Sequence, residues 1–214
     1  MGDFPVPEPP PWTVLLLGGP SGVGKTTLAA AIGRRFGASW LQVDDLRLAL
    51  QATRAALPAP PPDQDLAFFT DTPDVWRLPP PRLRDGLLAV AAAMAPALEI
   101  VTLNHADTAA PVVIEGDGIS PSLLARPAVR ARVDAGLVRA VFVVERDDAA
   151  LLANMLARGR GIADRPAAES RAEARTKWLH GRWLADEARR HGLPVVEARP
   201  WSTLAARVIT ASRP

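Results

Sequence analysis

The stretch from residue 12 to residue 27, WTVLLLGGPSGVGKTT, constrains the fold more than any other part of this chain of 214 residues. Its apolar run, Val14 to Leu17, stops at two glycines, and Gly19 opens the phosphate-binding pattern G-x-x-x-x-G-K-[ST], which ends at Thr26. Apolar residues then recur at helical spacing as far as Phe36. The order of strand, glycine loop and helix predicts an α/β fold whose first loop wraps a phosphate group.

The residue types of this loop indicate how it would hold a nucleoside triphosphate. Glycines let the backbone turn sharply and aim several N–H groups at one anion. The positive end of the following helix adds to that attraction. We expect Lys25 to reach the β- and γ-phosphates, the Thr26 hydroxyl to ligate Mg²⁺ and Thr27 to contact the α-phosphate. The predicted nucleotide-binding residues are Gly19, Ser21, Gly22, Val23, Gly24, Lys25, Thr26 and Thr27. The alternative, a chance match in a glycine-rich turn, is disfavoured by the flanking strand and helix.

Composition argues against several other classes of protein. The chain has no Cys, which leaves no disulfide framework or thiolate metal site, and its three His have no zinc-like spacing. The first 12 residues lack the basic and apolar regions of a signal peptide. No apolar run approaches the length of a membrane span. We therefore expect a cytoplasmic protein with no membrane partner.

The charge balance does not indicate a nucleic-acid partner, although the isoelectric point is about 9.9. The chain has 25 Lys and Arg against 23 Asp and Glu, and the basic residues are spread along it without clustering. The expected state is a monomer or homodimer that acts on a small molecule.

Strand and helix patterns alternate along most of the chain. Residues 1–11 are a Pro-rich arm, and residues 12–214 are expected to form a single domain. We expect strands at 12–18, 39–43, 111–115, 137–144 and 195–198, and helices at 25–36, 46–56, 81–103, 121–135, 147–157, 167–191 and 201–211. This alternation predicts a parallel sheet with helices on both faces, a three-layer α/β fold.

Acidic residues follow the second predicted strand, at the edge where open α/β sheets bind ligands. A carboxylate at Asp44 would accept the proton of an attacking hydroxyl during phosphoryl transfer. Arg47, three residues later, would hold the acceptor or the migrating phosphoryl group. The alternative reading of this pair of acids is a helix cap, which suits Asp45 better than Asp44.

Acids also follow the next two strands. Glu115 is expected to help position Mg²⁺, with an ordinary polar strand end as the alternative. Asp117 is expected on the substrate side, although Gly-Asp-Gly is also a good turn. Glu145 and Asp147 are expected to cap the following helix and are left out of the site.

An arginine–glycine segment, 158–166, separates two predicted helices. Arginines on a segment that closes over the site would cover charge that spreads over the phosphoryl oxygens. We predict Arg158 and Arg160 as catalytic and Arg165 as substrate-binding. The alternative is a helix C-cap with solvated charge. Lys177 on the next helix is expected on a solvated face.

Two further regions complete the predicted site. Arg199 and Trp201 follow the last strand, where an adenine ring would lie, with helix packing as the alternative for Trp201. Acceptor recognition is expected in residues 57–110. There, one group of residues suits an anionic acceptor and another suits an apolar or aromatic one, and both readings stay open. The first group is Arg47, Arg77, Arg82 and Arg84; the second is Phe68, Phe69 and Trp76.

Together, GPSGVGKT, VDDLR, VVIEG and the arginine–glycine segment resemble the P-loop small-molecule kinases in content and order. VDDLR is similar to the D-x-x-R element of polynucleotide kinases, zeta toxins and the chloramphenicol phosphotransferase, in which the Asp is the base; this maps onto Asp44. VVIEGDGISP is similar to the corresponding strand of 2-phosphoglycerate-kinase-like proteins. The resemblance covers most of residues 12–208 and implies a five-stranded parallel sheet of order 2-3-1-4-5 with a helical lid. It also implies Mg²⁺-ATP as donor and a hydroxyl acceptor.

The leading hypothesis is therefore an ATP-dependent phosphotransferase that moves the γ-phosphoryl group to a hydroxyl of a small molecule. One alternative is an antibiotic- or nucleotide-sugar-modifying phosphotransferase. Another is a nucleotide-switched binding protein with weak ATPase activity. A GTPase switch is disfavoured because the sequence has no base-reading N-K-x-D element; residues 104–107, NHAD, lack the Lys.

Overall fold

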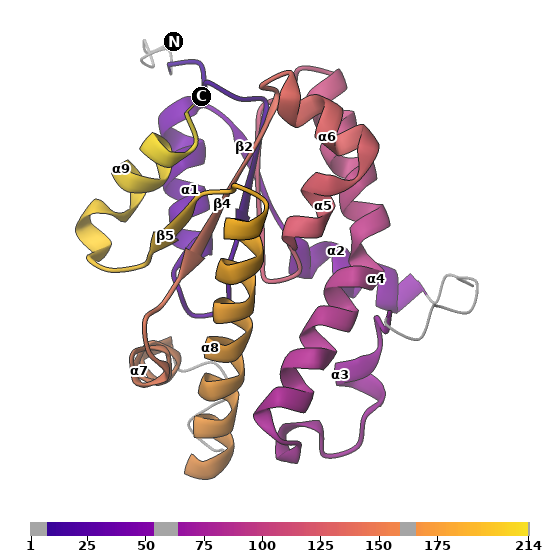
Figure 1. Cartoon of the computed structure of the whole chain (residues 1–214), viewed down its shortest axis with the longest axis vertical. Helices are drawn as coiled ribbons and strands as arrows, with labels where there is room; N and C mark the ends of the chain where they lie inside the picture. The colour runs from indigo at the N-terminus through magenta and orange to yellow at the C-terminus, as the bar shows by residue number, and fades with distance from the viewer. Residues whose placement is uncertain (1–7, 54–63, 159–165, 214) are drawn as a thin grey trace, which may run out of the picture.

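The computed structural model describes residues 8–53, 64–158 and 166–213, and its centre is a sheet of five parallel strands (Figure 1). The strands are β1 (Val14–Gly18), β2 (Ser39–Gln42), β3 (Val112–Gly116), β4 (Val138–Val144) and β5 (Val195–Glu197). Their order is β2-β3-β1-β4-β5, so the predicted order 2-3-1-4-5 is confirmed.

Helices cover both faces of this sheet. α1 and α9 lie on one face, whereas α4, α5 and α6 lie on the other, and the long α8 packs against α4, α7 and β4 (Figure 1). The helices are α1 (Lys25–Phe36), α2 (Val43–Thr53), α3 (Phe68–Asp71), the 3₁₀ helix η1 (Val75–Arg77), α4 (Pro80–Asp107), α5 (Pro121–Ala125), α6 (Pro127–Asp134), α7 (Asp148–Arg158), α8 (Ala167–Arg190) and α9 (Trp201–Ala211).

The strand sequences explain why the sheet is buried between two cores. Side chains alternate between the two faces of a strand. In β1, Val14 and Leu16 enter one core, and Leu15 and Leu17 enter the other. All residues of β1 and β3 are buried, as expected for strands of a parallel sheet covered on both faces.

Some predicted boundaries are wrong. α2 begins at Val43, so Asp44 lies in the first turn of a helix rather than at a strand end, a position that favours acids because the helix N-terminus is positive. The predicted helix 121–135 is two helices. Arg126 is extended between them, because the residue before a proline avoids the helical conformation and Pro127 starts the next helix.

The long helix α4 also departs from expectation. Among the described residues it is the one helix long and apolar enough to cross a membrane by length and composition, although no such run was expected. Leu83, Val90, Met94 and Leu98 on this helix are buried in one core. Packing in a core layer accounts for the same composition, so the apolar character alone does not indicate a membrane.

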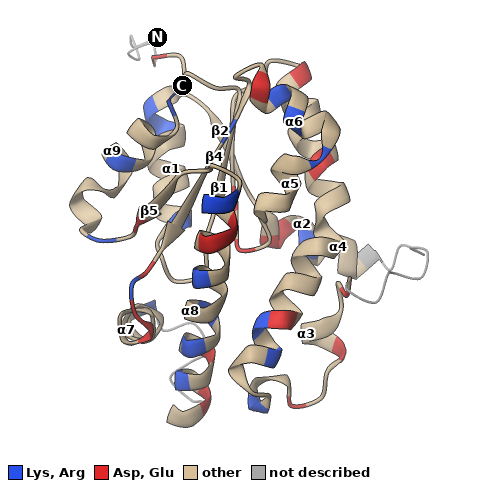
Figure 2. Ribbon diagram, in the orientation of Figure 1, with Lys and Arg blue, Asp and Glu red and all other residues tan. Residues whose placement is uncertain are grey.

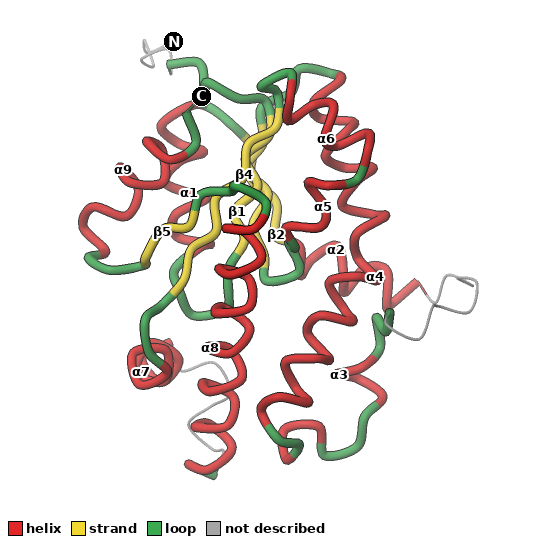
Figure 3. Tube along the Cα trace, in the orientation of Figure 1, coloured by secondary structure: helices red, strands yellow, loops and turns green. Residues whose placement is uncertain are grey.

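The strand register places every strand's carboxyl end at one edge of the sheet. Gly18 of β1 lies beside Gly116 of β3 and Phe142 of β4, and Gln42 of β2 pairs with Glu115. The loops that follow these ends gather at the lower edge in Figure 3. The phosphate loop, the start of α2 and the segment after β3 therefore meet there.

Candidate active site

The phosphate loop joins β1 to α1 in a conformation that requires glycine. Gly19, Gly22 and Gly24 have φ angles of 141°, 98° and 82°, values that side chains of L-residues rarely adopt. Gly24 is the N-cap of α1. Lys25 is buried, and its Nζ donates a hydrogen bond to the carbonyl oxygen of Pro20 at 3.0 Å, which holds it across the loop.

Two other elements hold this loop from outside. The Trp201 ring lies where a Cβ on Gly24 would have to be, and the ring of Pro20 lies 2.8 Å from the Cβ position of Gly181 in α8. Trp201, which was predicted near the adenine ring, thus packs on the phosphate loop and is 41% exposed. Its assignment to nucleotide binding stays a prediction.

A single cavity brings together residues of the loop and the acids after β2 and β3. It is lined by Ser21, Gly22, Gly24, Lys25, Thr26, Gln42, Asp44, Glu115, Gly116, Asp117 and Arg158. Sequence reasoning named most of these residues but not Gln42, whose position at the end of β2 becomes clear only from the sheet register. The cavity places a phosphate-binding loop opposite three carboxylates.

A hydrogen bond joins Thr26 to the strand-end acid. The Thr26 hydroxyl donates to Glu115 Oε1 at 2.6 Å. Burial raises the pKa of Glu115, against the opposing effects of Lys25 and this hydrogen bond. Burial likewise lowers the pKa of Lys25, against the attraction of Asp117 and Glu115. The opposite charges therefore stabilise one another in a partly dehydrated site.

These oxygens fit the predicted Mg²⁺. Among the described residues, no three His, Asp or Glu side chains gather as ligands of one ion. Mg²⁺ beside a nucleotide needs fewer protein ligands, because phosphate oxygens and waters complete its octahedral coordination. A hydroxyl and a carboxylate already 2.6 Å apart, Thr26 and Glu115, supply oxygen donors of the kind it prefers.

Asp44 lies on the open side of this cavity. Its side chain is 60% exposed, and Arg47 Nη2 lies 3.3 Å from its Oδ1. Loss of solvent on one side and repulsion by Asp117 raise the pKa of Asp44, whereas Arg47 lowers it. Asp44, and not its neighbour Asp45, is among the lining residues.

The predicted lid falls only partly within the described residues. Arg158 is the last residue of α7 and lines the cavity. Arg160 and Arg165 lie outside the described residues, so the lid and their roles stay predictions.

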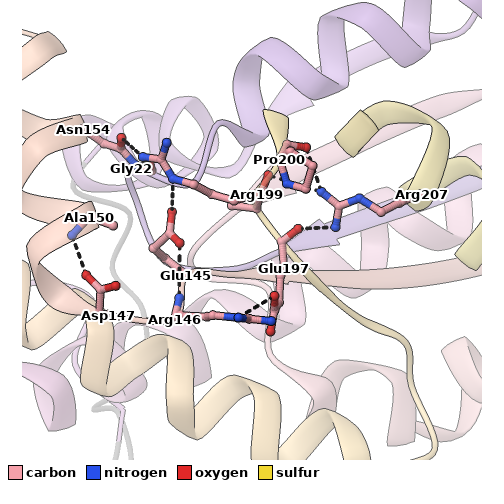
Figure 4. Close-up of polar contacts among 11 residues, drawn as sticks. Gly22, Glu145, Arg146, Asp147, Ala150, Asn154, Glu197, Arg199, Pro200 and Arg207 are labelled. Atoms are coloured by element: carbon pink, nitrogen blue, oxygen red, sulfur yellow. Dashed lines mark hydrogen bonds and ion pairs between the residues drawn. The ribbon is translucent and has the colours of Figure 1, made fainter. Parts of the chain in front are cut away.

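A polar network ties the loop after β5 to the phosphate loop (Figure 4). Arg199 bonds Asn154 Oδ1 at 3.0 Å and lies 3.4 Å from Oε2 of buried Glu145. Asn154 Nδ2 in turn donates to the Gly22 carbonyl oxygen at 3.1 Å. Both Glu145 and Asp147 were expected to cap α7. The prediction is wrong for Glu145, which bonds Arg199 instead, whereas Asp147 does accept a hydrogen bond from the Ala150 N–H at 2.7 Å. Sequence reasoning missed Asn154, because no motif marks it.

A second cavity, of about 210 Å³, shares Ser21, Asp44 and Asp117 with the first. Its other walls come from α2, α3, η1, α4 and α8, and include Val43, Arg47, Phe69, Trp76, Leu87, Val90, Met94, Gly118, Glu173 and Lys177. Lys177 is only 15% exposed and bonds Glu173 at 2.5 Å, so its expected place on a solvated face is wrong.

No protein-family model and no curated protein sequence matches the chain. Among solved structures, it is similar to a gluconokinase from Sinorhizobium meliloti 1021, with 16% identity, a TM-score of 0.51 and coverage of 97% of this chain and 90% of that one. It is also similar to the shikimate kinase from Acinetobacter baumannii in complex with shikimate, with 14% identity, a TM-score of 0.51 and 94% coverage of both chains. The fold is that of P-loop kinases. At these identities the likeness shows the fold alone, and the narrower resemblance to the 2-phosphoglycerate kinase, chloramphenicol phosphotransferase and zeta-toxin group stays a prediction.

Basic and acidic residues occur together on several helices (Figure 2), as the even spread of basic residues in the sequence indicated. Lys and Arg are interspersed with Asp and Glu on α4, α6 and α8 (Figure 2). A basic stripe of the kind that binds nucleic acid would carry one sign. The lack of a nucleic-acid partner stays a prediction.

Proposed function

We propose that this protein is an ATP-dependent phosphotransferase that moves the γ-phosphoryl group to a hydroxyl of a small molecule. One observation carries the proposal: Asp44 lies between the phosphate-loop cavity and a second, partly apolar cavity and lines both. A carboxylate at that junction suits a base between donor and acceptor. The P-loop kinase fold, shared with a gluconokinase and a shikimate kinase, supports it.

The transfer would proceed in line. The acceptor oxygen bonds to the γ-phosphorus as the bond from that phosphorus to the β,γ-bridging oxygen breaks, and ADP leaves with the bonding electrons. The hydroxyl proton passes to Asp44. A raised pKa makes this carboxylate a better proton acceptor than a fully solvated one.

Positive groups on the donor side would stabilise the charge that develops. Lys25 and Arg158 line the donor cavity, and fixed charges in a site that excludes water act more strongly than in bulk solvent. Thr26 and Glu115 would hold Mg²⁺, which would neutralise phosphate charge when bound. We further propose residues 12–214 as one cytoplasmic kinase domain, with residues 57–110 contributing to acceptor binding.

The test compares Asp44→Asn with the matched control Asp45→Asn, one residue along the same exposed turn of α2. Labelled ATP is offered with a panel of hydroxyl compounds that includes gluconate and shikimate, and labelled product is separated from phosphate. Asp44→Asn should lower transfer by about 10²–10⁴-fold and leave ATP affinity, measured by calorimetry, unchanged. Asp45→Asn should behave as the native protein.

Two outcomes would count against this function. Undiminished transfer by Asp44→Asn would remove Asp44 as the base. ATP binding without any acceptor that raises turnover above slow hydrolysis would instead support the nucleotide-switched binding protein.

A further inference from the structure

The wall of the second cavity combines apolar and charged side chains. Leu87, Val90 and Met94 lie at positions i, i+3 and i+7 of α4, so they form one stripe along that helix. The same cavity is lined by Phe69 and Trp76, whose rings stack with centroids 5.5 Å apart and an interplanar angle of 29°. These side chains offer flat, apolar surfaces and no hydrogen-bonding group except the indole N–H.

Acidic groups outnumber basic groups in the wall of this cavity. Among the described residues, the charged side chains that line the cavity are three carboxylates and two cations. They are Asp44, Asp117, Glu173, Arg47 and Lys177. The wall as a whole is negative, which disfavours an anion.

Both cations are already paired with carboxylates of the same wall. Arg47 lies 3.3 Å from Asp44 and donates to Gln51 Oε1 at 3.1 Å. Lys177 lies 2.5 Å from Glu173, and these two side chains are 15% and 8% exposed. Drawing either cation toward an anionic ligand would leave a carboxylate in the wall without its partner, which is costly in a partly buried site.

The other arginines that suited an anionic acceptor do not line this cavity. Arg77 is 70% exposed and lies near Asp74 and Glu169. Arg84 pairs with its neighbour Asp85 at 2.5 Å. Arg82 lines a different cavity, beside Ser120 and Trp183. Of the four candidate arginines, Arg47 alone reaches the wall.

We propose that the acceptor is an uncharged alcohol with a small ring or branched hydrocarbon body. Its hydroxyl lies at Asp44, and its body lies between the Phe69–Trp76 pair and the stripe of α4. The cavity volume, about 210 Å³, is below the roughly 300–1,000 Å³ of sites that enclose drug-sized ligands, so the body is small. This inference rests on the proposed transferase function.

The experiment uses pairs of acceptors that differ by one carboxylate. Benzyl alcohol is compared with para-(hydroxymethyl)benzoate, and cyclohexylmethanol with its ring carboxylate; gluconate and shikimate are added as anionic acceptors. Transfer of label from ATP gives kcat/KM for each. The uncharged member of each pair should have a kcat/KM about tenfold or more above that of its carboxylate, because the negative wall repels a carboxylate on the acceptor.

One variant tests the effect of charge in the cavity wall, and another tests its apolar contact with the acceptor. Leu87→Lys adds a cation to the wall and should raise kcat/KM for the carboxylates, relative to kcat/KM for the alcohols, by about tenfold. Its control is Leu48→Lys, at an α2 position that is 54% exposed and outside the cavity. Trp76→Ala should raise KM for the alcohols by about tenfold with little change in kcat, because it removes apolar contact and no reacting group.

The outcomes separate this inference from the function on which it rests. Transfer that favours gluconate, shikimate or the carboxylates, or that does not distinguish the pairs, would overturn the uncharged acceptor while the transferase function stands. A protein that binds ATP but transfers to no compound of either class would overturn both.

Discussion

The donor and acceptor sides of this site are built in different ways, although they meet at Asp44. The donor side is built around one continuous segment, residues 19–26, whose shape is held by its glycines and by contacts from α8 and from Trp201 at the start of α9. The acceptor side is assembled from five helices, from Ser21 of the phosphate loop and from the segment after β3. A local sequence motif determines the phosphate loop of the donor side, whereas the acceptor side forms only when distant segments pack together in the tertiary fold.

The chain has only two lysines, and each side of the site contains one. Lys25 is buried against the phosphate loop, and Lys177 is paired with Glu173 in the acceptor cavity. The two lysines therefore offer a direct test of whether ATP binding and acceptor binding depend on separate sides of the site.

The largest expected effect comes from Lys25→Met. Removing a preorganised charge from the reacting group should lower kcat by about 10²–10³-fold and weaken ATP binding. Lys177→Met should instead leave ATP affinity unchanged and alter KM for the acceptor. Calorimetry with ATP and steady-state transfer assays measure the two. Equal loss of ATP affinity in both variants would contradict the division into donor and acceptor sides.

The next effect concerns His180 of α8, a buried side chain whose pKa is affected by burial and by the charges of Asp117 and Lys25. Its side chain is 1% exposed, and neither ring nitrogen has a partner among the described residues. Burial lowers its pKa to about 4; nearby Asp117 opposes this, while Lys25 and Arg84 reinforce it. Since the folded pKa lies below the unfolded value of 6.5, the unfolded chain takes up the proton first as pH falls.

The free energy of unfolding therefore keeps its full value, as far as His180 is concerned, above pH 6.5. It falls between pH 6.5 and about pH 4, where the unfolded chain is protonated at His180 and the folded chain is not. The loss should reach about 3 kcal/mol, and urea unfolding at a series of pH values measures it. His180→Leu should remove this part of the pH dependence, whereas exposed His191→Gln should keep it. A wild-type slope that persists in His180→Leu would assign the titration to other groups.

The sequence predicted the glycine conformations of the phosphate loop and the sheet well, for physical reasons. The glycine positions of the motif need positive φ angles, and Gly19, Gly22 and Gly24 have them. The strand order, which the family resemblance implied, is also correct. By contrast, Lys177 was placed on a solvated face, because helical spacing alone does not reveal that α4 and η1 pack beside α8.

Some of the missed features had a visible local signal and others had none. Pro127 in the sequence was sufficient to split the helix predicted at 121–135. Nothing near Asn154 or Glu145 in the sequence marks their bonds to Gly22 and Arg199, which span 132 and 54 residues. Contacts of this range depend on the assembled sheet, so these two hydrogen bonds were missed although Gly22, Arg199 and Glu145 had been named for other roles.

A smaller effect is expected from Gly24→Ala, which meets both an unfavourable φ angle and the Trp201 ring. Gly192→Ala is the matched control, because Gly192 has a φ of 67° but no atom within 4 Å of its Cβ position. Gly192→Ala should cost about 1 kcal/mol of unfolding free energy, and Gly24→Ala about 2 kcal/mol more, together with weaker ATP binding. Equal costs in urea unfolding would show that the Trp201 contact does not constrain the loop.

The smallest effect tests whether the Asn154 network belongs to the donor side alone. Asn154→Ala removes the hydrogen bond to the Gly22 carbonyl and the one from Arg199, but it leaves the lining residues of both cavities in place. A net loss of about 1 kcal/mol per hydrogen bond predicts ATP affinity weakened by about fivefold to thirtyfold, with acceptor KM unchanged. Asn104→Ala, at an exposed position on α4, is the control and should change neither. If acceptor KM rises with the ATP Kd in Asn154→Ala, the phosphate loop transmits its conformation to Asp44, and the two sides do not act independently.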